Sequence, residues 1–157
     1  MDKDQLLGRE KVTLDAKGRL ALPARYRTSV AQLCADRLVL TEHPDGYLLL
    51  MPEPKWQSFA QQFVNAGHGS QWLKRILLGS ACPVELDAAK RLLLPPELRE
   101  AVGIDKQALL IGVGEYFEIW QPAEYAARRG EQRASRLAQG ANPDPQALQA
   151  SLAEVKW

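Results

Sequence analysis

The sequence has little of the material from which metal sites and enzyme active sites are usually built. Its 157 residues include two cysteines, Cys34 and Cys82, and two histidines, His43 and His68. The cysteines lie far apart without the spacing of metal ligands, which favours free thiols in a reducing compartment. Neither histidine pairs recognisably with a serine or cysteine, and phosphate-loop and dinucleotide glycine patterns are absent. We therefore expect no catalytic residues, metal, cofactor or small-molecule substrate.

Long apolar runs and a large net charge are also missing. No stretch approaches the roughly 18 uninterrupted apolar residues of a membrane span. The first residues, Met1 to Gln5, lack a signal-peptide pattern. With 46% hydrophobic residues, 25% charged residues and a net charge of +1, the composition is that of a folded globular domain. We expect a cytoplasmic protein that does not bind membranes.

One segment of the sequence occurs twice. Residues 12–30 are identical to residues 84–102 at ten of nineteen positions, where average residue usage gives roughly one match. Both copies keep an Asp-x-x-x-Arg unit, from Asp15 to Arg19 and from Asp87 to Arg91. A single copy of about 70 residues would bury too little surface to be comfortably stable. We therefore expect the two copies to share one core as a pseudo-symmetric pair.

Each copy predicts the same order of elements. In the first, residues 12–14 and 19–22 read as the strands of a hairpin, and the turn between them presents Lys17 and places Gly18 at positive φ. A helix from Pro23 to about Cys34 follows, then a second hairpin over residues 38–51. The second copy predicts strands over 84–86 and 91–94, a helix ending near Gly103 and a hairpin over 107–120. Lys90 stands where the first copy has Gly18. A residue other than glycine there either accepts the left-handed conformation at a cost of about 1–2 kcal/mol or the turn is built differently, and we expect the second turn to differ in shape.

Helices are also predicted outside the repeats, over residues 56–64, 71–78 and 123–139. Four arginines on the last one indicate a solvated face. Residues 142–145 interrupt it, and the final residues predict a short helix or a frayed tail. The segment from Gly67 to Ser70 could cradle an anion in a phosphate-binding enzyme or hydrolase, but a flexible linker is the preferred interpretation.

The basic residues are unevenly distributed between the copies. From Arg9 to Arg27 there are six basic residues against two acidic ones, a net charge of +4, whereas residues 84–99 are neutral. The Asp-x-x-x-Arg unit is open to two interpretations, an internal ion pair that staples each hairpin or a device that orients an arginine toward a polyanion. Exposed ion pairs contribute only about 0–1 kcal/mol. A two-stranded ribbon with such side chains fits the major groove of DNA, so DNA binding is the main hypothesis. A protein-interaction module, antitoxin-like or scaffolding, is the alternative.

The same residues resemble a known family. The segments Leu6-Leu7-Gly8, Val12 through Arg27, Arg75 through Gly79 and Asp87 through Pro95 look like MraZ, a family of bacterial transcriptional regulators. The likeness runs from about residue 6 to Tyr125. It implies an α+β, β-rich fold in which two SpoVT-AbrB-type repeats form a pseudo-dimeric, duplicated swapped-hairpin barrel with connecting and C-terminal helices. The expected organisation is repeat one over 9–56, a helical connector over 57–80, repeat two over 81–124, and a C-terminal helix and tail over 125–157.

The resemblance also implies a function. Members bind tandem repeats of double-stranded DNA in the promoter of the division and cell-wall gene cluster that contains their own gene, and they assemble into rings. By position, the expected DNA-binding residues are Lys17, Arg19, Arg25, Lys90 and Arg91, and the residues that shape the turns are Asp15, Gly18 and Asp87. Lys90 stands where the family pattern has glycine, so the second turn departs from that pattern. We expect a nucleoid-associated, ring-forming regulator that is not an enzyme.

Overall fold

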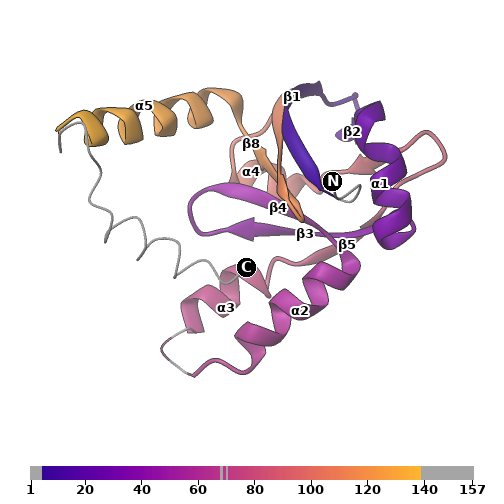
Figure 1. Cartoon of the computed structure of the whole chain (residues 1–157), viewed down its shortest axis with the longest axis horizontal. Helices are drawn as coiled ribbons and strands as arrows, with labels where there is room; N and C mark the ends of the chain where they lie inside the picture. Colours follow the sequence, from indigo (N-terminus) through magenta and orange to yellow (C-terminus); the bar gives the residue numbers. More distant parts are fainter. Residues whose placement is uncertain (1–4, 68, 70, 139–157) are drawn as a thin grey trace. The chain divides into compact units, whose positions relative to one another are not determined.

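The computed structural model describes residues 5–67, 69 and 71–138 (Figure 1). Both repeats have the same order of elements, two strands, a helix and two further strands. The elements are β1 (Leu6–Thr13), β2 (Arg19–Ala21), α1 (Ala24–Cys34), β3 (Arg37–His43), β4 (Tyr47–Pro52), α2 (Glu53–Val64), α3 (Gln71–Leu77), β5 (Cys82–Glu85), β6 (Arg91–Leu93), α4 (Pro96–Ala101), β7 (Gln107–Gly114), β8 (Phe117–Trp120) and α5 (Pro122–Ala138).

The strands pair so that the two repeats exchange partners. Six of them form one antiparallel sheet in the order β1-β7-β8-β4-β3-β5. Replacing each strand by its equivalent in the other repeat gives the same order read backwards. The first strand of each repeat therefore pairs with the other repeat, β1 with β7 and β5 with β3. This is the pseudo-symmetric pair that the duplicated sequence predicts.

The hairpin predicted within each repeat is wrong except at its turn. Strand β2 pairs with β6 of the other repeat, Leu20 opposite Leu92, in a separate two-stranded ribbon. Within the first repeat, a single bridge between Leu14 and Leu20 remains. Local turn chemistry cannot distinguish these pairings, because the partner strand is far away in the sequence. The described strands form an open sheet and a ribbon, so the closed barrel that the resemblance implies is not confirmed.

One hydrophobic core lies between the repeats, as expected. Its fully buried members include Leu20 and Leu22 of the first repeat and Leu92 and Leu94 of the second. Helix α1 adds Tyr26 and Val30, with the Tyr26 ring edge-on to Phe117 at 4.9 Å. Because the apolar residues of both ribbon strands enter this core, neither repeat can bury its own ribbon strand alone.

Proline starts both repeat helices. Pro23 and Pro95 occupy the N-cap positions of α1 and α4, so the expected helix beginning at Pro23 in fact begins one residue later. The second-copy helix also ends before Gly103, at Ala101. Proline suits a helix start because its φ is fixed and its missing N–H has no intrahelical acceptor there. These caps set the direction in which the chain leaves the ribbon.

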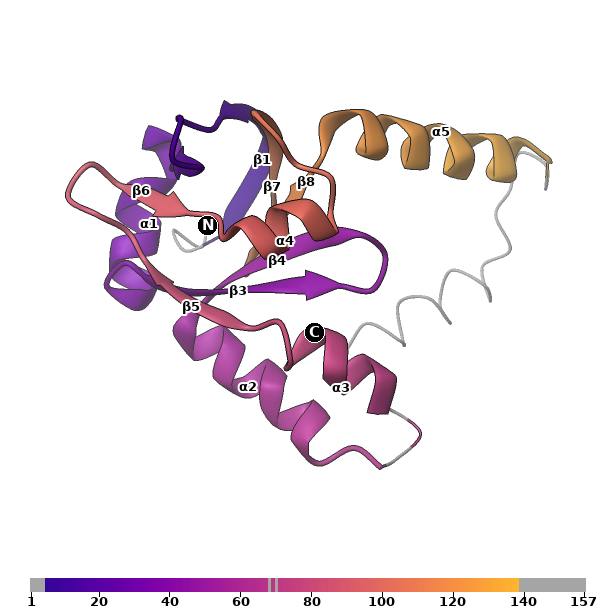
Figure 2. The same cartoon turned by 180° about the vertical axis from the view of Figure 1, so that it is seen from behind.

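Helices α2 and α3 lie side by side next to β3 (Figures 1 and 2). Phe59 of α2 and Leu77 of α3 are buried. The buried hydroxyl of Thr41 on β3 donates a hydrogen bond of 2.5 Å to the carbonyl oxygen of Leu77. This contact fixes the end of α3 to the sheet, which gives the connector between the repeats a defined attachment.

The later hairpins of both repeats are confirmed, β3 with β4 and β7 with β8. Gly112 pairs with Phe117 inside the second hairpin, so it belongs to the strand and not to the turn. Helix α5 is confirmed over Pro122–Ala138 and belongs to a second compact unit that begins at Ala123. The interruption at 142–145, the tail, His68 and Ser70 lie outside the described residues. None of the described helices is long and apolar enough to span a bilayer.

Candidate nucleic-acid interface

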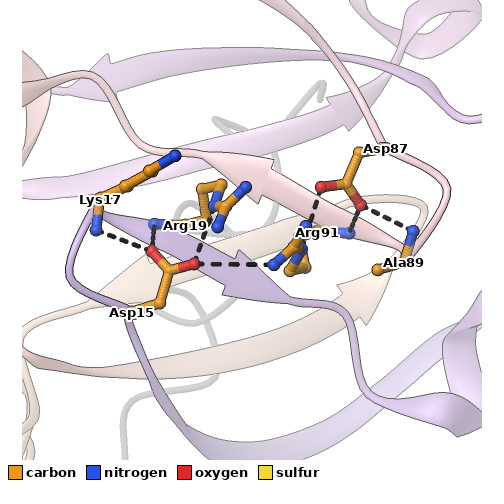
Figure 3. A network of polar contacts seen from close by, with 6 residues as sticks. All are labelled: Asp15, Lys17, Arg19, Asp87, Ala89 and Arg91. Carbon is orange, nitrogen blue, oxygen red and sulfur yellow. Dashed lines mark hydrogen bonds and ion pairs between the residues drawn. The ribbon is translucent and has the colours of Figure 1, made fainter.

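The two Asp-x-x-x-Arg units form turns with the same hydrogen bonds. In the first, Oδ1 of Asp15 accepts hydrogen bonds from the backbone N–H groups of Lys17 and Arg19, at 3.0 and 2.9 Å. In the second, Oδ1 of Asp87 accepts them from Ala89 and Arg91, both at 2.9 Å (Figure 3). An aspartate that bonds the backbone two residues ahead is the usual stabiliser of such a turn. Each repeated aspartate therefore accepts the same two backbone hydrogen bonds within its own turn.

The expectation that Lys90 changes the shape of the second turn is wrong. Lys90 adopts the left-handed conformation, φ 61°, which Gly18 adopts at φ 81° in the first turn. The N–H of each residue donates a 2.9 Å hydrogen bond to the carbonyl oxygen of its own aspartate. A residue with a Cβ has this conformation at a cost of roughly 1–2 kcal/mol. The fold imposes the same turn on both sequences.

Each aspartate also holds its own arginine. Nε of Arg19 lies 2.8 Å from Oδ2 of Asp15, and Nε of Arg91 lies 3.0 Å from Oδ2 of Asp87. The arginine side chains remain 28% and 36% exposed. These pairs use only the Nε atom of each guanidinium, so its two terminal nitrogens can donate hydrogen bonds to a further partner.

The strand exchange brings the two units into one network. Nη1 of Arg91 lies 3.9 Å from Oδ2 of Asp15, which also accepts the Nε–H of Arg19 (Figure 3). The antiparallel register places Arg19 opposite Leu93 and Ala21 opposite Arg91. The two arginines therefore lie near each other on one ribbon, and the two turns lie at its opposite ends. The two turns therefore belong to one ribbon and not to two separate hairpins.

The ribbon has a buried face and an accessible face. Leu20 and Leu92 are buried, whereas Ala21 and Leu93 are exposed and Arg19 and Arg91 are half-buried. Side chains alternate between the two faces of a strand. Both arginines therefore belong to the accessible face, and Lys17 at the adjoining turn is exposed as well.

Arg27 and Arg99 are structural arginines to which sequence reasoning gave no role. Nε of Arg27 donates to the carbonyl oxygen of Leu22, and Nε of Arg99 to that of Leu94. A Cβ at Gly18 would lie 2.8 Å from Cζ of Arg99. A Cβ at Gly18 would therefore require the Arg99 guanidinium to shift, in addition to a positive φ at that residue. Arg27 and Arg99 occupy matching positions in the two copies, and this match was the sequence signal that could have indicated their structural role.

Hydrogen bonding lowers the pKa of both turn aspartates. For Asp15 the largest cause is the backbone N–H of Arg19, followed among the lowering causes by the Arg19 side chain. For Asp87 the largest cause of the lowered pKa is the backbone N–H of Arg91. These bonds favour the carboxylate form. Both arginines are therefore held by charged partners at neutral pH.

Two of the predicted DNA-binding residues lie outside this network. Nε of Arg25 on α1 lies 3.4 Å from Oε1 of Glu10, and its guanidinium packs over the Tyr26 ring. Nζ of Lys90 lies 2.5 Å from Oδ2 of Asp36. The structure thus brings together Lys17, Arg19 and Arg91 with their aspartates, and pairs Arg25 and Lys90 with other carboxylates.

The described residues contain no cluster of histidine, cysteine, aspartate or glutamate that could hold a metal ion. The cationic groups of the ribbon are instead suited to hydrogen bonding and charge attraction. Arginine offers paired donors that match phosphate oxygens and the acceptor edge of guanine. The accessible cations of the ribbon thus have the hydrogen-bonding chemistry that suits a polyanion.

Known proteins resemble this chain over most of its length. The family model described as "MraZ protein, putative antitoxin-like" matches residues 6–71 and again residues 77–143. A protein of Cupriavidus pinatubonensis called "Transcriptional regulator MraZ" is 47% identical over 133 residues, 85% of this chain and 91% of its own length. Proteins of the same name from Acidovorax sp. and Burkholderia vietnamiensis are 45% identical over 121 residues and 44% identical over 133 residues, covering 77% and 85% of this chain and 85% and 91% of theirs. On this evidence, the chain belongs to the MraZ family.

Proposed function

We propose that this protein is a transcriptional regulator that binds double-stranded DNA with the accessible face of the β2–β6 ribbon. One observation carries the proposal: Arg19 and Arg91, from different repeats, share that face and are each oriented through Nε by an aspartate. The family membership supports the regulatory role, because the relatives are called transcriptional regulators.

The chemistry of the ribbon suits the major groove. The groove of B-DNA admits a two-stranded ribbon, and arginine is the commonest partner of the O6 and N7 atoms of guanine. Lys17 lies at one end of the ribbon, where a lysine can contact the phosphate backbone. Asp15 and Asp87 restrict the arginine side chains before DNA arrives, which lowers the entropy lost on binding.

Several copies of the ribbon would have to act together. One subunit offers few phosphate contacts, so its own binding is weak and sensitive to salt. We expect a ring-like homo-oligomer in which neighbouring ribbons engage DNA boxes spaced about one helical turn apart. From the family resemblance, the expected target is a set of tandem repeats in the promoter of the division and cell-wall gene cluster, with the protein at the nucleoid.

Gel-shift titration tests this proposal directly. The probes are a duplex with the tandem promoter repeats and a duplex of the same composition with the repeats scrambled. We expect clear preference for the tandem repeats at moderate salt, and native mass spectrometry should detect several protein chains per duplex. Equal affinity for both duplexes would refute sequence-specific binding.

Exposed apolar side chains on helices α2 and α3 favour a second candidate function, the binding of another protein. Val64, Trp72 and Leu73 on α2 and α3 are 60%, 66% and 39% exposed, and exposed apolar groups of this size often mark protein interfaces. An antitoxin-like or scaffolding protein would use them to bind another polypeptide. Recovery of a stoichiometric protein partner, without retention of DNA, would favour this function over the first.

A further inference from the structure

The two ends of the ribbon differ in charge although their backbones match. The first turn presents Lys17, which is exposed and makes no ion pair among the described residues. The equivalent residue of the second turn is Ala89, which offers no charge. The lysine of the second turn, Lys90, is one position further along, where the first turn has Gly18. Within the described part of the chain, the turn lysine without an ion pair is therefore at the Lys17 end of the ribbon.

Lys90 already has an anionic partner within the chain. Its Nζ lies 2.5 Å from Oδ2 of Asp36, and the two side chains are 33% and 18% exposed. Asp36 follows α1 in the left-handed conformation, φ 64°. Its other oxygen, Oδ1, is buried and has no hydrogen-bond partner among the described residues. The negative charge of Asp36 is thus satisfied mainly by Lys90, which ties the lysine to the protein.

Pseudo-symmetry identifies Asp36 as the residue that differs. The carbonyl oxygen of Asp36 accepts a 3.0 Å hydrogen bond from the N–H of Leu86, just before the second turn. At the equivalent place before the first turn, the carbonyl oxygen of Lys106 accepts a 2.7 Å bond from the N–H of Leu14. A lysine therefore stands beside the first turn where an aspartate stands beside the second. The backbone hydrogen bond is equivalent, and the charge of the side chain is opposite.

We propose that Asp36 masks Lys90, so that the ribbon grips the DNA backbone at its Lys17 end and not at its Lys90 end. This inference rests on the proposed DNA binding. A lysine that neutralises a phosphate releases counterions, and each such contact steepens the salt dependence of affinity. A lysine already paired with a carboxylate adds no such contact. The ribbon consequently has a direction on the duplex, although the repeats that build it are nearly symmetric.

The test is the salt dependence of binding to one duplex, measured by fluorescence anisotropy for the wild type and three variants. In a plot of log affinity against log salt, each phosphate contact contributes a slope of about 0.9. Lys17→Gln should flatten the plot by about this amount. Asp36→Asn should steepen it by about 0.9, because Lys90 becomes free to reach a phosphate. Asparagine is chosen since it tolerates the left-handed conformation.

The double variant Asp36→Asn/Lys90→Gln is the decisive control. If the pair is masked in the wild type, removing both charges should leave the slope unchanged. A slope that falls by about 0.9 would mean that Lys90 contacts a phosphate in spite of Asp36, and would overturn the inference. An unchanged slope for a folded Asp36→Asn protein would also overturn it.

Melting temperatures of all variants establish that they are folded. Should Asp36→Asn fail to fold, Lys90→Gln alone still decides the matter, because its slope should equal that of the wild type and a flatter plot would refute masking. A wild-type protein that binds no duplex would refute the proposed function itself. Wild-type binding combined with slope changes other than those expected would refute only the role of Asp36.

Discussion

The Oδ2 atom of Asp15 lies 3.9 Å from Nη1 of Arg91, an arginine of the other repeat. The same oxygen accepts the Nε–H of Arg19 from its own turn. One carboxylate thus faces two arginines that come from separate copies of a duplicated sequence. This contact exists because β2 and β6 pair with each other, and it turns two local ion pairs into one surface.

Replacing the ribbon arginines should affect binding much more than folding. We expect Arg19→Ala and Arg91→Ala each to weaken binding to the target duplex by about 1–3 kcal/mol. The melting temperature should change little, since an ion pair this exposed contributes about 0–1 kcal/mol to stability. Gel-shift titration and thermal melting measure the two effects. Arg37→Ala is the matched control, because Arg37 is an exposed arginine that lies on β3, outside the ribbon, and pairs with Glu53 of α2.

A large loss of stability in Arg19→Ala, with binding retained by the folded fraction, would favour the staple interpretation instead. The two interpretations therefore make opposite predictions for a single variant.

The faces of the ribbon should respond differently to truncation. Leu92→Ala removes a side chain that is 1% exposed and should reduce the free energy of unfolding by about 2–5 kcal/mol. The neighbouring Leu93→Ala removes one that is 49% exposed, and we expect a change within about 0.5 kcal/mol. Urea denaturation of both variants measures the difference. Similar losses for the two would contradict the register of β2 with β6.

Substitution of Gly18 should destabilise the protein, although the equivalent position of the second turn is occupied by Lys90. An alanine at position 18 has to adopt φ 81°, and its Cβ would lie 2.8 Å from Cζ of Arg99. Gly18→Ala should therefore cost about 1–2 kcal/mol of stability from backbone strain alone. Gly67→Ala, where nothing lies within 4 Å of the added carbon, is the control and should be nearly neutral. Unfolding in urea decides between these expectations, and equal stability of Gly18→Ala and the wild type would refute the strain argument.

Acid should weaken the turns. Hydrogen bonds from Arg19 and Arg91 lower the pKa of Asp15 and Asp87 below the ordinary value of 3.8. The stabilisation from each carboxylate is therefore fully present above the pKa of the unfolded chain, and it is lost as the pH falls through the lower folded pKa. We expect the melting temperature to fall between about pH 5 and pH 2.

The double variant Asp15→Asn/Asp87→Asn isolates this effect. Its melting temperature should be lower than that of the wild type at neutral pH and should fall less steeply on acidification. Parallel curves for the two proteins would show that these aspartates do not contribute to the acid response. Differential scanning calorimetry over a series of buffers gives both curves.

Sequence reasoning identified the members of the site better than their arrangement. The duplicated Asp-x-x-x-Arg units predicted the turns, and both have the expected aspartate-to-backbone hydrogen bonds. The pattern also indicated Lys17 and Arg19 as accessible cations, and the structure leaves both accessible. It did not indicate Asp36, because that residue lies outside the repeated motif and meets Lys90 only across the fold.

What the sequence determined by itself was local. Proline and aspartate placed the helix starts and the turns, and the match between residues 12–30 and 84–102 determined that two equivalent units share a core. The helix starts and turns depend on interactions between residues a few positions apart, which sequence patterns record directly, and the duplication is visible in the sequence as the repeat itself.

The tertiary structure decided which strands pair and which charges meet. The hairpin pattern of residues 12–22 suited pairing within one repeat, yet β2 pairs with β6, and the leucines of both strands are buried in one core. The same packing forced Lys90 into a glycine-like conformation and set its charge against Asp36. Burial of apolar surface is not directional, so a strand pattern can predict that a face is buried without specifying the strand that covers it.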